Sequence, residues 1–206
     1  MCNYCAKWAE EGRIWYNAGM EKELYFLRSS EQYLAKELLQ YAVHFDETRS
    51  SLEEYPSLEQ YHREYGAFNG DIGVYLTADK KAAGGAWVRL LANGFALVDH
   101  DTPELVCAVL PEFRGQGIGT LVLQQLFVEV SKIYPQISLS VTKDSPAIAL
   151  FARLGFVEVE NSEHRNAQAE EAIIMLKVFD EAAAPKEEKL SKLEEECFRK
   201  SFRAPY

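Results

Sequence analysis

The segment VLPEFRGQGIGT, residues 109–120, largely decides how this chain is interpreted. Glycines stand at three alternate positions, Gly115, Gly117 and Gly119, after one apolar run and before another. Glycine lets a backbone approach a ligand closely, and successive N–H groups at a helix N-terminus attract anions. The segment therefore predicts a phosphate-binding turn between a strand and a helix.

Two common phosphate loops do not fit this turn. A Walker loop requires a lysine, and none follows Gly115 in QGIGTL. A dinucleotide fingerprint requires a third glycine at the position that Thr120 occupies. A third pattern fits: arginine or glutamine, two residues, glycine, one residue, then glycine or alanine, as in residues 114–119. That pattern points N–H groups at a diphosphate, with the favourable end of a helix dipole behind them.

Composition limits the class of protein. The chain has 206 residues, 48% of them hydrophobic, which is enough for one domain with a proper core. The net charge of −10 argues against a nucleic-acid partner and mildly favours cationic or neutral small substrates. No apolar run approaches the roughly 20 residues of a membrane span, and the first residues lack a signal-peptide pattern. We expect a cytoplasmic protein without a membrane partner.

The pattern of apolar residues predicts one mixed α/β domain over residues 23–180. Residues 1–22 read as an N-terminal extension with a CxxC motif, and residues 181–206 as a charged helical tail. Helices are predicted at 31–45, 57–66, 118–133 and 146–155, the last with Ser145 as cap and Gly155 as its stop. Strands are predicted at 23–30, 71–79, 82–91, 104–110, 137–144, 156–160 and 172–179.

The four cysteines do not form a disulfide framework in a chain of this size. Cys2 and Cys5 make half of a zinc or redox motif, but no second CxxC exists and the four histidines show no paired ligand spacing. Cys107 lies within an apolar run and is interpreted as a small buried hydrophobe. No metal is predicted.

Two motifs at the right spacing identify a family resemblance. VCAVLPEFRGQGIGTLVLQQL, residues 106–126, resembles motif A of the GCN5-related N-acetyltransferase (GNAT) superfamily, and SPAIALFARLGF, residues 145–156, resembles its motif B, NPAxxLYxxxGF. The resemblance covers residues 24–179. It implies an α/β fold of the mixed α+β kind, the GNAT-type acyl-CoA N-acyltransferase fold, whose mixed, mostly antiparallel twisted sheet is flanked by helices. It also implies transfer of acetyl from acetyl-CoA to an amine by direct attack.

The resemblance also implies roles for particular residues. The turn takes the pyrophosphate, and Arg114 lies near the phosphates; the alternative for Arg114, a surface arginine without a ligand, is less favoured. The end of the preceding strand pairs with the pantetheine arm, and the Val109 N–H polarises the thioester oxygen. The implied cofactor-binding residues are Ala108, Val109, Leu110, Arg114, Gly115, Gln116, Gly117, Ile118, Gly119, Thr120, Ser145 and Phe151.

The catalytic candidates are Glu104, Val109 and Ser145. Glu104 begins the strand that leads to the cofactor, where this family often places a carboxylate, and it can serve as base directly or through water, or be only a solvated strand-end carboxylate. His100, between Asp99 and Asp101, is a weaker candidate base. Motif B departs from the family because Phe151 replaces the tyrosine that protonates the CoA sulfur, so Ser145 or a water would have to substitute.

Two other readings stay open. A catalytically weak acyl-CoA sensor or interaction module would keep the cofactor site without efficient turnover, and Phe151 is the residue that supports it. The acceptor is a small-molecule or protein amine that the sequence does not identify, and the fold also permits a homodimer. The aromatic residues considered for an acceptor site are Tyr55, Tyr61, Tyr65, Trp87 and Phe95.

Overall fold

The computed structural model describes residues 22–48, 50–68 and 70–179. The predicted N-terminal extension, apart from its last residue, and the predicted C-terminal tail lie outside the described residues, and so do Cys2, Cys5 and Cys197. The boundaries 23–180 therefore remain a prediction. No helix in the described ranges is long and apolar enough to cross a membrane.

One sheet organises the described part of the chain, in the order β1-β2-β3-β4-β5-β8-β6, with β7 paired to β8. Every neighbouring pair is antiparallel except β4 and β5, which are parallel. The predicted mixed, mostly antiparallel sheet is confirmed. Its strands are β1 (Lys22–Phe26), β2 (Ile72–Ala78), β3 (Lys81–Arg89), β4 (Glu104–Val109), β5 (Gln136–Thr142), β6 (Val157–Glu158), β7 (His164–Arg165) and β8 (Glu171–Val178).

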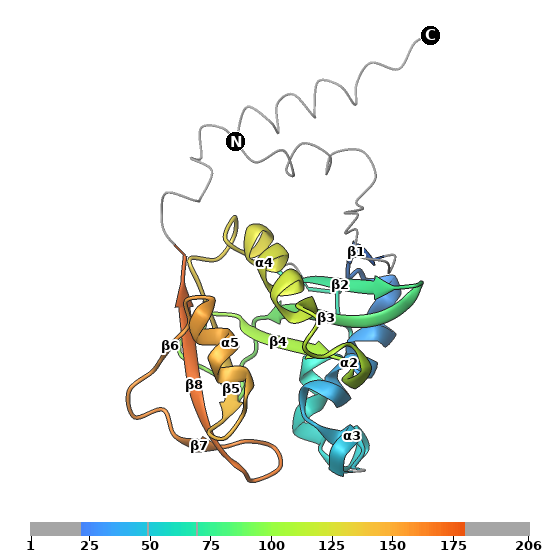
Figure 1. The fold of residues 1–206 in the computed structure, drawn as a ribbon. Coiled ribbons are helices and arrows are strands. Elements are labelled where there is room, and N and C mark those ends of the chain that lie inside the picture. Colours follow the sequence, from blue (N-terminus) through green and yellow to red (C-terminus); the bar gives the residue numbers. More distant parts are fainter. Residues whose placement is uncertain (1–21, 49, 69, 180–206) are drawn as a thin grey trace, which may run out of the picture.

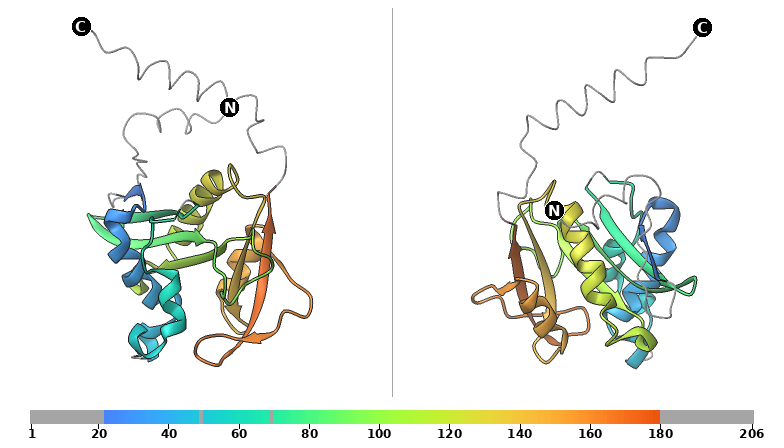
Figure 2. Two further views of the ribbon diagram at one scale, coloured as in Figure 1. Left: turned by 180° about the vertical axis from the view of Figure 1, so that it is seen from behind. Right: turned by 45° about the horizontal axis from the view of Figure 1, so that its top comes forward.

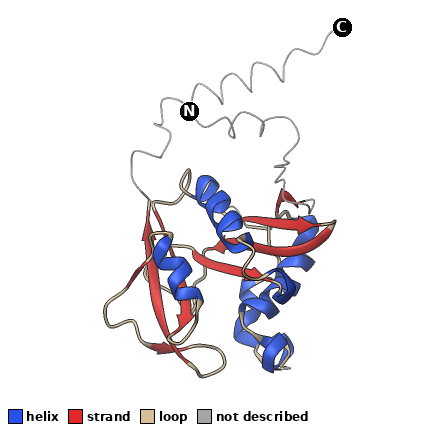
Figure 3. Ribbon diagram, in the orientation of Figure 1, coloured by secondary structure: helices blue, strands red, loops and turns tan. Residues whose placement is uncertain are grey.

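Helices cover both faces of the sheet (Figures 1 and 3). Helix α4 (Ile118–Val130) packs on β2 and β3, and α5 (Ala147–Arg153) shares the same hydrophobic core. Helix α2 (Gln32–Ala42) packs behind β4, as the reverse view in Figure 2 shows. A second core lies on that side. The short elements are α3 (Phe45–Thr48) and the 3₁₀ helices η2 (Ser29–Glu31), η3 (Leu52–Glu54), η4 (Pro56–Tyr61) and η5 (Pro111–Phe113).

The parallel strands β4 and β5 part soon after they meet. Their register contains a single pair, Glu104 with Ser138, and one further hydrogen bond, from the Ser138 N–H to the Pro103 carbonyl at 3.1 Å, closes the same end. Beyond that point each strand continues without the other. The sheet therefore opens between β4 and β5, and this opening positions the site.

Several predicted elements differ from the structure at their ends or in type. The predicted strand 23–30 stops at Phe26, and the predicted helix 31–45 ends at Ala42 before a left-handed residue, His44. The predicted helix 57–66 is the shorter 3₁₀ helix η4. Strand 156–160 shrinks to two residues, and β7 was not predicted. Gly155 has the predicted left-handed backbone, with φ of 89°.

Candidate active site

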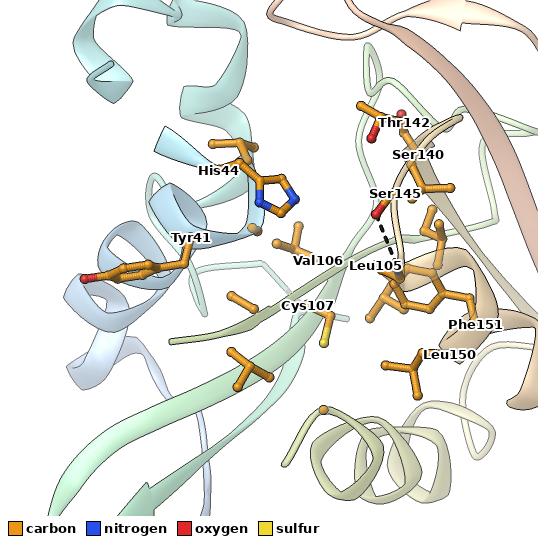
Figure 4. Close-up of a pocket in the computed structure, with 18 of the residues that line it drawn as sticks. Tyr41, His44, Leu105, Val106, Cys107, Ser140, Thr142, Ser145, Leu150 and Phe151 are labelled. Atoms are coloured by element: carbon orange, nitrogen blue, oxygen red, sulfur yellow. Dashed lines mark hydrogen bonds between the residues drawn. The ribbon is translucent and has the colours of Figure 1, made fainter. Parts of the chain in front are cut away.

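A cavity of about 810 Å³ occupies the opening between β4 and β5. Figure 4 shows labelled side chains of β5 and α5 on one side of this space and His44, after α2, on the other, with β4 between them, while the Tyr41 ring of α2 points away. Of the predicted cofactor residues, nine line the cavity: Ala108, Val109, Arg114, Gly115, Gly117, Gly119, Thr120, Ser145 and Phe151. The structure therefore brings most of the predicted set together at one place.

Three predicted cofactor residues are not among those that line the cavity. The Leu110 N–H donates to the Ala83 carbonyl at 3.0 Å, within the sheet. The Gln116 side chain is exposed and donates to the Glu112 carbonyl at 3.0 Å. The Ile118 side chain is buried in the core beneath α4. Only the backbone of residues 116 and 118 is therefore available for the predicted role.

The glycine turn has the backbone that an anion site requires. Gly115 and Gly117 have φ of 74° and 78°, which non-glycine residues rarely adopt, and a side chain at either position would enter open space. The first backbone hydrogen bond of α4 runs from the Leu121 N–H to the Gly117 carbonyl at 3.1 Å. The N–H groups of residues 118–120 precede it and are the unpaired donors of a helix N-terminus. They lie at the rim of the cavity, where an anion would meet them.

The backbone of Val109 faces the opening. Peptide groups of successive strand residues point to opposite sides, and that of Leu110 points to β3. Those of Val109 therefore point toward the gap, where the carbonyl accepts a hydrogen bond from Arg114 Nε at 3.2 Å. The Val109 N–H lies on the same side and is placed to donate to a ligand.

Arg114 is held at the mouth of the cavity. Its Nη1 donates to Glu47 Oε1, an atom of α3, at 3.1 Å, and His44 Nδ1 lies 3.5 Å from the same oxygen. The Arg114 hydrogen bond and the charge of His44 lower the pKa of the Glu47 carboxyl, which is exposed. The predicted phosphate contact of Arg114 would have to compete with this ion pair, which is solvent-exposed and therefore weak.

Glu104 is sealed rather than solvated. The residue is 3% exposed, the Tyr61 hydroxyl donates to its Oε2 at 2.7 Å, and the Phe95 N–H donates to that hydroxyl at 2.9 Å. Its Oε1 makes no hydrogen bond to any residue in the described ranges, and a Cβ on Gly94 would come within 1.5 Å of it. Burial raises the pKa of the carboxyl, and the Tyr61 hydrogen bond opposes that rise.

Ser145 and Phe151 lie where motif B predicts. The Ser145 Oγ accepts the N–H of Ala147, the first residue of α5, at 3.2 Å, as Figure 4 shows, but Pro146 and not the predicted Ser145 occupies the N-cap position. The Phe151 ring is 8% exposed and packs edge-on against Phe156, with 5.6 Å between ring centroids. Phe151 therefore lines the cavity with an apolar surface and has no proton to give.

The remaining predicted residues divide. Tyr61 and Phe95 line the cavity, whereas Trp87 and Tyr65 are buried in the core behind β4. The loop cluster of Asp99, His100 and Asp101 is exposed and is not among the residues that line the cavity. Within the described ranges no group of three His, Cys, Asp or Glu side chains is arranged to hold a metal.

One polar pair in the cavity wall was missed from the sequence. The Ser140 Oγ lies 2.8 Å from the Nε2 of His164, whose Nδ1 lies 2.9 Å from the Ser162 carbonyl oxygen. Ser140 lines the cavity on β5, and His164 comes from the two-residue strand β7. Nothing in the sequence around Ser140 marks it as a functional residue, because a serine at an alternate position of a strand is common. Its partner His164 is also 24 residues away in the chain.

Comparisons with known proteins find similar sequences and similar folds. Residues 71–158 match the family model of the acetyltransferase (GNAT) domain. An N-alpha-acetyltransferase of Sulfurisphaera tokodaii is 39% identical over 71 residues, which are 33% of this chain and 42% of that relative, so the match spans less than half of its length.

Solved structures share the fold, and two of them serve as examples. The ribosomal-protein-S18-alanine N-acetyltransferase of Escherichia coli superposes with a TM-score of 0.55 at 22% identity, covering 81% of this chain and 97% of that one. The yncA protein of Salmonella typhimurium, solved with its cofactor acetyl-CoA, gives 0.56 at 17% identity, covering 81% and 98%.

Proposed function

We propose that the protein transfers an acetyl group from acetyl-CoA to a primary amine, because residues 71–158 match the model of the GNAT acetyltransferase domain. The observation that carries the proposal is the cavity between β4 and β5, with the glycine turn and the N-terminus of α4 at its rim. A diphosphate would lie against the N–H groups of residues 115–120. The pantetheine arm would extend along the unpaired side of β4.

The proposed reaction is a direct attack. The neutral amine nitrogen forms a bond to the thioester carbon, the carbon–sulfur bond breaks, and the amine loses one proton. The Val109 N–H would stabilise the negative charge that develops on the carbonyl oxygen. The thiol has a reference pKa near 8.5 and can leave as a thiolate without an acid, which accommodates Phe151. The Ser145 hydroxyl oxygen already accepts the Ala147 N–H at the start of α5 and would need an intervening water to reach the sulfur.

We propose that Glu104 takes part as a buried carboxylate that acts through an intervening group. Its side chain lines the cavity, but the loop at Gly94 covers Oε1 and Tyr61 occupies Oε2. Direct contact with an amine would require that loop to move. Replacement by glutamine, E104Q, keeps the shape and removes the charge, and we expect it to lower kcat/KM while acetyl-CoA affinity is unchanged.

The acceptor we propose is an α-amino group, as in the names of the Sulfurisphaera and Escherichia coli proteins. Glu47, Glu104 and Glu170 line the cavity and would favour a cationic acceptor. An α-amine has a pKa of about 7.7–8.0, against about 10.4 for lysine, so a weak base can deprotonate it at neutral pH. Peptides with a free N-terminus should therefore be acetylated faster than N-terminally blocked peptides that contain a lysine.

The cofactor site is tested by a matched pair of variants at Gly117. Asparagine tolerates the left-handed backbone, and the open space at this position accepts its side chain. Gly117→Asn should keep acetyl-CoA affinity within a few-fold, whereas Gly117→Asp, of the same shape but negatively charged, should weaken it at least tenfold by charge repulsion. Calorimetric titration with acetyl-CoA measures both. Equal affinities in the two variants would remove the diphosphate from this turn.

A second candidate is an acyl-CoA sensor, and the apolar Phe151 together with the sealed Glu104 favours it. The same experiments separate the two functions. Micromolar acetyl-CoA binding without turnover of any peptide or small amine would support the sensor. Turnover of a free N-terminus would support the transferase.

A further inference from the structure

The Ser140–His164 pair has only one consistent arrangement of protons in its neutral form. The Ser162 carbonyl can only accept a hydrogen bond, so the His164 Nδ1, 2.9 Å away, must carry the ring proton. The Nε2 then has a lone pair, and the Ser140 hydroxyl, 2.8 Å away, donates to it. The backbone thus fixes the tautomer in which the serine hydroxyl is polarised toward a base.

The pair lies on the same face of the sheet as Glu104. Glu104 pairs in register with Ser138, and side chains two residues apart on a strand share a face. Ser140 therefore follows Ser138 on the same face of β5, at the point where β5 has separated from β4, and it lines the cavity. The charge of His164 acts on the Glu104 carboxyl and favours its ionised form.

We propose that Ser140 contacts the acceptor amine and passes its proton to His164; this rests on the acetyltransferase function proposed above. Ser140 is half-buried and belongs to the cavity wall, while Glu104 is covered and its Oε2 is already engaged. In this proposal Ser140, and not the covered Glu104, contacts the amine.

The proton transfer balances without another reactant. As the amine nitrogen bonds to the thioester carbon, its N–H proton moves to the Ser140 Oγ, and the Ser140 hydroxyl proton moves to the His164 Nε2. The serine is regenerated as a hydroxyl, the histidine becomes an imidazolium, and the CoA thiolate departs. The imidazolium then loses its proton to solvent or to the thiolate.

This assignment predicts how the rate depends on pH. The pair accepts a proton only when the imidazole is neutral, so kcat/KM should be lower in acid than in alkali, and His164→Asn should change this dependence. The charged groups around His164 are Glu104 of β4, Glu163 and Arg165 on either side of it, Lys143 after β5, which pairs with Glu163 at 3.4 Å, and Glu171 of β8. Glu163→Gln changes this surrounding charge without touching the pair and is the matched control.

The first experiment reads the tautomer and needs no turnover. Two-dimensional ¹⁵N NMR of the histidine rings in the full chain, with and without CoA, should show His164 protonated at Nδ1 at pH 8. The resonances are assigned by their loss in His164→Asn, whose amide keeps a donor for the Ser162 carbonyl. A ring protonated at Nε2 instead would overturn the proposal.

The second experiment uses acetyl-CoA and peptides with a free N-terminal Ala, Ser or Met. Ser140→Ala and His164→Asn should each lower kcat by about 10²-fold, and the double variant should lose no more, because the two residues act as one unit. Ser140→Thr keeps the hydroxyl and should retain most activity. Added imidazole should rescue His164→Gly but not Ser140→Ala.

The outcomes separate this proposal from the function on which it rests. Unchanged pH profiles in His164→Asn, with normal wild-type turnover, overturn the relay and leave the transferase intact. A wild type that binds acetyl-CoA but acetylates none of the peptides, nor any small amine, overturns both. Additive losses, or a Glu163→Gln variant as impaired as His164→Asn, would indicate a structural role and overturn the relay.

Discussion

At the scale of single residues, Glu104 couples stability to pH. Burial raises the pKa of its carboxyl above the value of about 4.3 in an unfolded chain. Between those two values the folded state binds more protons than the unfolded one, so the free energy of unfolding falls as pH rises through the folded pKa. Each pKa unit between the folded and unfolded states changes the free energy of unfolding by about 1.4 kcal/mol.

E104Q should therefore be more stable than the wild type at pH 8, with the gap closing as pH falls toward 4. The amide oxygen can still accept from Tyr61, so the packing is preserved. Urea denaturation at a series of pH values measures the difference. Equal stabilities at every pH would mean that the carboxyl is better solvated than its surroundings in the structure indicate. If E104Q is more stable than the wild type but has a lower turnover, the carboxylate of Glu104 contributes to activity at a cost in stability.

Phe151 permits a second residue-scale prediction. Phe151→Tyr adds the hydroxyl that the family normally has in motif B, on a ring that already lines the cavity. We expect acetyl-CoA affinity to stay intact and turnover not to fall, since the new hydroxyl can protonate the departing sulfur. Titration and steady-state kinetics check both quantities. A strong loss of turnover with normal affinity would contradict the placement of this ring beside the sulfur.

At the scale of elements, the loop between β3 and β4 is fitted to the carboxylate beneath it. Only a glycine leaves room at position 94, because a Cβ there would overlap Glu104 Oε1. Gly94→Ala should destabilise the protein by roughly 1–3 kcal/mol, the usual range for forced overpacking. In a Glu104→Ala background the same change should be nearly neutral, since the carboxylate is gone. Denaturation of the four proteins completes the cycle, and additive losses would show that the loop does not rest on this side chain.

The opening between β4 and β5 leads to a prediction about amide exchange. The N–H groups of Cys107 and Val109 point toward the gap, away from β3, and a bound pantetheine arm would cover them. Acetyl-CoA should slow hydrogen exchange in the peptide that spans β4 and leave the β2–β3 hairpin unchanged. Exchange measured by mass spectrometry with and without ligand tests this. Protection confined to the turn at 114–120 would place the arm elsewhere.

At the scale of the whole molecule, the sequence predicted those helices, strands and turns that are determined by residues close to one another in the chain. Three glycines before an apolar helix, and the punctuation from Ser145 to Gly155, mark their elements without help from distant residues. The alternation of apolar residues placed most strands to within two residues. The predicted helix 57–66 is instead the 3₁₀ helix η4, and the Gln60, Tyr61 and Arg63 carbonyls, which a continuing helix would use, accept hydrogen bonds from the side chains of Arg89 and Trp87.

The parts that could not be predicted depend on contacts across the chain. The sequence left Glu104 as either a base or a solvated strand-end carboxylate, because neither the loop at Gly94 nor the hydroxyl of Tyr61, 43 residues away, could be seen to cover it. The two residues of β7 are too few to show a period, so His164 gave no sign of meeting Ser140. Contacts between residues that are distant in the chain decide which side chains are buried and which are hydrogen-bonded, and a single sequence does not reveal those contacts.

The separation of β4 and β5 soon after Glu104 and Ser138 also affects how well the protein resists unfolding and association with other chains. A sheet that opens in its middle has two strand edges with unpaired backbone groups, where other sheets have a continuous hydrogen-bond ladder. Such unpaired edges can pair with strands of other chains and are open to proteases. If a small metabolite fills that gap, it acts as a temporary strand, and ligand at a hundred times its dissociation constant adds about 2.7 kcal/mol to the resistance to unfolding. The lifetime of the molecule would then follow the supply of its own substrate.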